Sequence, residues 1–68
     1  MSDWNIVESY AAEELANEGL APGDLRRRWH EVADDMALIP ENNVRVVEQA
    51  GVVRVEVSEE LYDCMRGI

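Results

Sequence analysis

The sequence predicts a small α+β domain with the order ααββα, in which helices pack on a two-stranded antiparallel hairpin. Residues 44–57 read VRVVEQAGVVRVEV, two runs of alternating valines and polar residues around a central Ala50-Gly51. The segments before and after this stretch repeat their apolar residues at helical spacing instead. With 68 residues and 47% hydrophobic residues, the chain is long enough for one core, so residues 1–68 are expected to form a single domain.

The hairpin has one favoured register. With Ala50 and Gly51 at the loop centre, four valines share one face and an opposite-charge pair lies on the other face. The expected pairs are Val44 with Val57, Val46 with Val55 and Arg45 with Glu56. A slip of one residue would set valines against charged side chains. Alanine is a poor residue for a two-residue type I′ turn, so we expect a four-residue loop over residues 49–52 in the same register.

Residues 3–18 are expected to form the first helix. Ser2 or Asp3 can cap its start, and Gly19 is the typical residue just beyond a helix end. At about 100° per residue, most of its apolar side chains fall on one broad side. These side chains are Trp4, Ile6, Val7, Tyr10, Ala11 and Leu15.

A second helix is expected from Pro22 to about Ala37. Pro22 suits the first helical position, and Asp24 suits the positive end of the helix dipole. Its apolar stripe follows at helical spacing and is read as core: Leu25, Trp29, Val32 and Met36.

A turn at residues 38–43, marked by Pro40 and two asparagines, leads into the hairpin. Ser58 then caps a third helix, whose apolar side is expected to hold Leu61, Cys64 and Met65. A two-stranded sheet is only marginally stable alone. Either the helices cover the hairpin well or a second copy of the chain extends it as a homodimer.

The net charge is −9, and every basic residue is an arginine. Residues 1–20 hold five acids and no base. Such a surface repels nucleic acid and lipid headgroups and attracts basic protein surfaces, which predicts a protein partner and neither a membrane nor direct nucleic acid. Plain solubility or adaptation to a salt-rich cytoplasm would produce the same composition. The single cysteine, the absence of a long apolar run and the lack of a signal-peptide pattern are typical of a cytoplasmic protein.

No motif predicts catalysis, a metal or a cofactor. His30 is the only histidine, and it would need a nucleophile and an orienting acid nearby. Cys64 is the one thiol, and on a buried helical face it would be inert. One histidine and one cysteine far apart in sequence do not make a metal-binding cluster. We therefore expect a protein that is not an enzyme, with no catalytic residues, no metal and no cofactor.

The triplet Arg26-Arg27-Arg28 is the one basic cluster. The spacing from Gly19 to Leu25 resembles the turn glycine and buried aliphatic of helix–turn–helix proteins, although Leu15 stands where that family has a small residue. This resemblance implies a regulator whose second helix carries the three arginines into a DNA groove, with the hairpin as a wing. The acidic first helix opposes the phosphate contacts on which DNA affinity rests. The alternative is a lattice of ion pairs with the neighbouring acids Glu14, Glu18, Asp24 and Glu31.

In general character, over its whole length, this small acidic chain resembles the phage-encoded inhibitors that imitate nucleic acid, such as anti-CRISPR proteins. No single motif carries the resemblance. It implies a non-enzymatic inhibitor that binds the basic surface of a nucleic-acid-binding protein in the host cytoplasm. The other interpretations are a helix–turn–helix regulator, or an interaction module whose acidity reflects only solubility or salt. The candidate partner-binding residues are Glu8, Glu13, Glu18, Glu31, Asp34 and Asp35.

Overall fold

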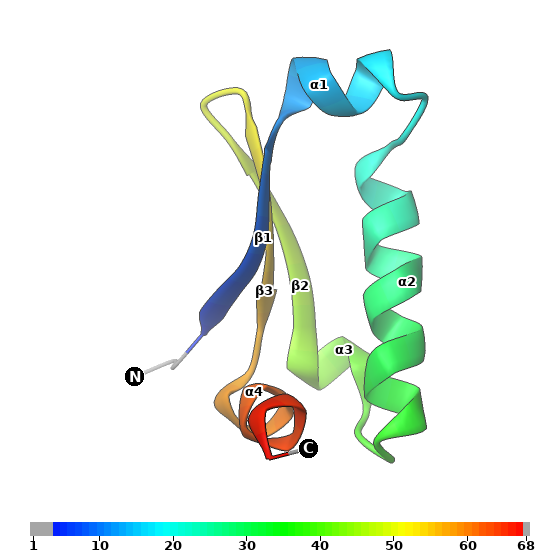
Figure 1. Ribbon diagram of the computed structural model, residues 1–68, viewed down its shortest axis with the longest axis vertical. Helices are drawn as coiled ribbons and strands as arrows, with labels where there is room; N and C mark the ends of the chain where they lie inside the picture. The colour runs from blue at the N-terminus through cyan, green and yellow to red at the C-terminus, as the bar shows by residue number, and fades with distance from the viewer. Residues whose placement is uncertain (1–3, 68) are drawn as a thin grey trace.

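The computed structural model describes residues 4–67, which form an α+β domain of three strands and four helices (Figure 1). The predicted class is confirmed, but the predicted order ααββα is wrong in detail. The elements are β1 (Asn5–Ala11), α1 (Ala12–Asn17), α2 (Pro22–Asp35), α3 (Pro40–Asn43), β2 (Val44–Gln49), β3 (Val52–Val57) and α4 (Glu59–Arg66).

The main difference from the sequence prediction is β1, because residues 5–11 were expected to be helical. This segment pairs antiparallel with β3, so the sheet has three strands in the order β1-β3-β2, and the predicted two-stranded sheet is wrong. Only the six residues of α1 remain of the expected first helix. The third strand gives β3 a partner on both sides, which a lone hairpin lacks.

The hairpin register is confirmed residue by residue. Val44 pairs with Val57, Val46 with Val55 and Arg45 with Glu56. The predicted four-residue loop is wrong, because Gln49 pairs with Val52 and leaves a two-residue turn. Both turn residues have the positive φ that a type I′ turn requires, 53° at Ala50 and 75° at Gly51.

The core lies between α2 and one face of the sheet, and α4 closes one end of it (Figure 1). Its buried apolar side chains are Leu15, Leu25, Ala33, Val44, Val53, Val55, Val57 and Leu61. Three of the four hairpin valines predicted to be core are buried, whereas Val46 is only half-buried.

Cys64 is exposed, so its predicted place on the buried side of the last helix is wrong. Leu61, Tyr62 and Met65 make the side of α4 that packs on the core. At about 100° per residue, Cys64 lies roughly 110° from the centre of that side. Within residues 4–67, no helix is both long and apolar enough to cross a membrane.

Candidate functional site: the acidic surface

Ten carboxylates of the described chain have no partner within it. Of the fifteen acids, Asp3 lies outside the described residues, and Glu8, Asp24, Glu56 and Glu59 each interact with other groups. The other ten are all exposed: Glu13, Glu14, Glu18, Glu31, Asp34, Asp35, Glu41, Glu48, Glu60 and Asp63. Their charges are therefore presented to solvent without an ion-pair partner, although Glu31 and Asp34 share a groove with Arg26 and Arg27.

Most of the arginines are already engaged, so they do not balance these acids. Ion pairs join Arg27 to Asp24, Arg28 to Glu8, and both Arg45 and Arg54 to Glu56. The guanidinium of Arg66 lies over the Tyr62 ring, 5.5 Å from its centroid. Of the lattice expected between the arginine triplet and neighbouring acids, only the pair of Arg27 and Asp24 forms, at 3.6 Å.

The unpaired acids gather at the two ends of the molecule. At the α1 end, α1 lies beside the tip of the hairpin (Figure 1), where the Ala12 amide donates to the Gly51 carbonyl at 2.9 Å. This end carries Glu13, Glu14, Glu18 and Glu48. At the α4 end, α2 packs on α3, and the link after α2 lies beside the start of α4. That end carries Glu31, Asp34, Asp35, Glu41, Glu60 and Asp63.

The structure therefore divides the predicted partner-binding residues between the two ends. Glu13 and Glu18 lie on α1, whereas Glu31, Asp34 and Asp35 lie in the second half of α2. The 14 residues of α2 separate the groups by about 20 Å, at 1.5 Å per residue. The two groups therefore lie toward opposite ends of α2.

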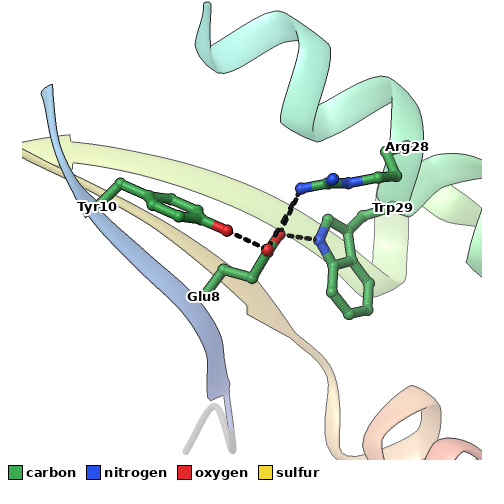
Figure 2. A network of polar contacts seen from close by, with 4 residues as sticks. All are labelled: Glu8, Tyr10, Arg28 and Trp29. Atoms are coloured by element: carbon green, nitrogen blue, oxygen red, sulfur yellow. Dashed lines mark hydrogen bonds and ion pairs between the residues drawn. The ribbon is translucent and has the colours of Figure 1, made fainter. Parts of the chain in front are cut away.

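Glu8 lies between the two ends, on the face of β1 that α2 covers (Figure 2). Its carboxylate accepts hydrogen bonds from the Tyr10 hydroxyl, from Trp29 Nε1 at 2.6 Å and from Arg28 Nη2 at 3.0 Å. Arg28 and Trp29 belong to α2, so this carboxylate ties the helix to the edge strand. Of the six predicted partner-binding acids, only Glu8 makes hydrogen bonds or an ion pair with other side chains of the described residues.

The pKa of Glu8 reflects two opposing causes. Burial favours the neutral acid and raises the pKa. The hydrogen bonds from Tyr10 and Trp29, together with the Arg28 charge, favour the carboxylate, and the net effect is a pKa below the usual 4.5. The same contact raises the pKa of the Tyr10 hydroxyl, because the hydrogen bond to Glu8 holds its proton. Glu8 is thus a carboxylate with a structural role.

The arginine triplet does not form one basic surface. All three arginines are exposed on α2, but Arg27 pairs with Asp24 and Arg28 pairs with Glu8. Arg26, Arg27 and His30 line an open groove on α2, and Glu31 and Asp34 line it as well. The helix–turn–helix interpretation also expected a full first helix, and half of that segment is β1.

The α4 end also has a hollow, which the sequence did not indicate. It measures about 450 Å³ and lies between the link after α2 and the start of α4. Ile39, 59% exposed, and Glu60 are among its lining residues. Two hydrogen bonds connect its lining residues: Ser58 Oγ donates to Asn43 Oδ1 at 2.6 Å, and Asn43 Nδ2 donates to the Ile39 carbonyl at 2.7 Å. An exposed apolar side chain thus shares the hollow with one unpaired carboxylate, Glu60.

Comparison of the chain with known protein families, curated proteins and solved structures finds no match. Within residues 4–67, no three side chains of histidine, cysteine, aspartate or glutamate are grouped so that they could hold a metal ion.

Proposed function

We propose that the protein is a non-enzymatic inhibitor that uses the α4 end to bind the basic surface of a nucleic-acid-binding protein, in the manner of anti-CRISPR proteins. The observation that carries the proposal is the set of ten exposed acids without partners, beside arginines that are mostly engaged. Charges presented this way attract a basic groove over several ångströms and speed association. The cytoplasm of the host cell is the expected place of action.

The α4 end is the better candidate of the two ends for this contact. It holds six unpaired carboxylates against four at the α1 end. It also offers Ile39 beside its hollow, and an exposed apolar side chain adds burial energy that carboxylates alone do not supply. Charge then guides the encounter, while the apolar contact slows dissociation.

The test compares two variants with the same change in net charge. The first replaces Glu31, Asp34, Asp35 and Glu41 with lysine, and the second replaces Glu13, Glu14, Glu18 and Glu48. A partner captured from a host lysate is measured for binding kinetics at two salt concentrations and for its binding to its own nucleic acid. We expect the wild-type chain to displace that nucleic acid, and its association to slow as the Debye length falls below about 8 Å. The first variant should lose binding, and the second should retain most of it.

Binding that is indifferent to salt would contradict the charge-based proposal. Equal loss in both variants would show that net charge acts rather than the α4 end. The helix–turn–helix alternative predicts a different result, namely a salt-dependent shift of duplex DNA that Arg27→Ala abolishes. We expect no DNA binding at physiological salt, because the exposed acids repel phosphates.

A further inference from the structure

The face of the sheet opposite α2 is not covered by any helix in the described part of the chain (Figure 1). Because side chains alternate along a strand, this outer face is defined by the register. Its main side chains are Ile6, Arg45, Val47, Val52, Arg54 and Glu56. Antiparallel sheets commonly leave one face to solvent, and that face is then usually polar. Here it is partly apolar.

The outer face carries a local excess of positive charge on an otherwise acidic protein. Glu56 is 6% exposed, and its carboxylate serves two arginines. Arg45 Nε lies 2.5 Å from one of its oxygens, and Arg54 Nε lies 3.6 Å from the other. Two cations therefore share one anion. The Arg54 Nε–H is shielded from solvent and makes no hydrogen bond, so Glu56 holds Arg54 by charge alone.

Apolar side chains surround these two arginines. Ile6 is 56% exposed, and Val47 and Val52 are half-buried. The Trp4 ring stacks on the Arg45 guanidinium, 4.3 Å from the ring centroid to the guanidinium carbon. This stacking already restrains the Arg45 side chain. A ligand that binds Arg45 therefore costs less rotamer entropy than it would at a free arginine. The outer face is thus a prearranged surface that combines two cations with apolar contacts.

The size of the outer face limits what can cover it. Three strands about 4.8 Å apart and six residues of about 3.3 Å each give an area of about 300 Å². A stable interface between folded proteins needs about 800 Å² on each partner. A second folded copy would therefore find too little area here. A single helix or extended segment fits the available width.

We propose that the outer face binds an acidic, apolar segment of another protein. A carboxylate of that segment accepts hydrogen bonds from Arg45 and Arg54, and its apolar side chains pack on Ile6, Val47 and Val52. The charge of the outer face is complementary to a carboxylate. A nucleic acid strand fits less well, because its many phosphates meet the ten unpaired acids and the aliphatic surface offers its bases little.

The test uses the full ¹⁵N-labelled chain and a short peptide in which leucine alternates with glutamate. A matched peptide has glutamine in place of glutamate. Two-dimensional NMR follows the two tryptophans separately, because Trp4 lies over Arg45 of the outer face and Trp29 lies on α2. We expect the glutamate peptide to shift the Trp4 indole and to leave the Trp29 indole in place. Its Kd should rise about tenfold in Arg54→Gln, as loss of one charge-assisted hydrogen bond predicts.

Arg66→Gln is the matched control, because it removes an arginine from α4 and should leave the peptide affinity unchanged. The undisturbed Trp29 indole signal verifies that each variant is folded. Val47→Glu, which adds a negative charge to the outer face, should abolish binding of the glutamate peptide. Equal binding of the glutamine peptide, shifts confined to α2, or no binding by either peptide would overturn the proposal. Displacement of the peptide by oligo-dT would assign the outer face to nucleic acid instead.

Discussion

Two alanines hold a backbone conformation that alanine disfavours, so glycine at either position should stabilise the protein. The φ angle is 53° at Ala50, in the hairpin turn, and 60° at Ala37, just after α2. A left-handed conformation costs an L-residue about 1–2 kcal/mol. Glycine avoids this cost but loses about 0.5–1 kcal/mol more backbone entropy on folding. The difference predicts that Ala50→Gly raises the free energy of unfolding by about 0.5–1 kcal/mol.

The measurement is thermal unfolding followed by circular dichroism. In a domain of this size, 1 kcal/mol corresponds to a Tm change of about 4–8 °C, so we expect a rise of about 2–8 °C. Ala37→Gly should act similarly, because Ala37 lies just beyond the end of α2, with its amide bonded to the Asp34 carbonyl at 3.0 Å. The control is Ala16→Gly inside α1, which should lose about 1 kcal/mol. A Tm for Ala50→Gly as low as that of the control would refute the reasoning.

Three further results are expected. Val55 is fully buried, so Val55→Ala should lower the free energy of unfolding by about 1–3 kcal/mol in urea titrations, and a smaller loss would show that the site is not core. The lowered pKa of Glu8 gives stability that is present above pH 4.5 and lost as the pH falls through the folded value, so the stability gap between wild type and Glu8→Gln should narrow in acid. The exposed thiol of Cys64 should react with a thiol reagent in the native protein; reaction only after unfolding would place it in the core.

The hairpin register could be predicted because residues 44–57 contain both strands, and therefore the side chains of both faces of the hairpin. Valines alternate with charged residues over 44–57, and only one pairing sets Arg45 opposite Glu56 while the valines meet. The turn could not be predicted, because Ala50 adopts a conformation that local preference opposes. The pairing of two six-residue strands outweighs a turn cost of about 1–2 kcal/mol.

The strand β1 was missed because its alternation is broken and its central inward residue is charged. The register shifts between Ile6 and Glu8, so Val7 packs against the core next to another inward residue and the spacing looks helical. A glutamate that faces the core, as Glu8 does, also argues against a strand unless the side chains that hydrogen-bond to it are known. The side chains that bind Glu8, Arg28 and Trp29, lie about 20 residues later in the sequence, and no local sequence pattern indicates these contacts.

The site was predictable in its chemistry and not in its placement. The excess of acids follows from composition. The ion pair of Arg27 with Asp24 follows from their spacing of three residues on a helix. The separation of Glu13 and Glu18 from Asp34 and Asp35 depends on how α1 meets α2, which requires the three-dimensional fold. The outer-face arginines were foreseen only in part, because the predicted pair of Arg45 and Glu56 left Arg54 out.

The position of β3 at the centre of the sheet sets the order in which the chain can fold. The β2–β3 hairpin joins neighbouring segments, whereas β1 must pair across nearly the whole chain, Asn5 with Val57. Closing so long a loop costs entropy before any contact compensates for it. During synthesis, β1 therefore has no sheet partner until β3, residues 52–57, has been added. Until then its strand edge is open, and the early chain is exposed to pairing with other molecules at its N-terminal end.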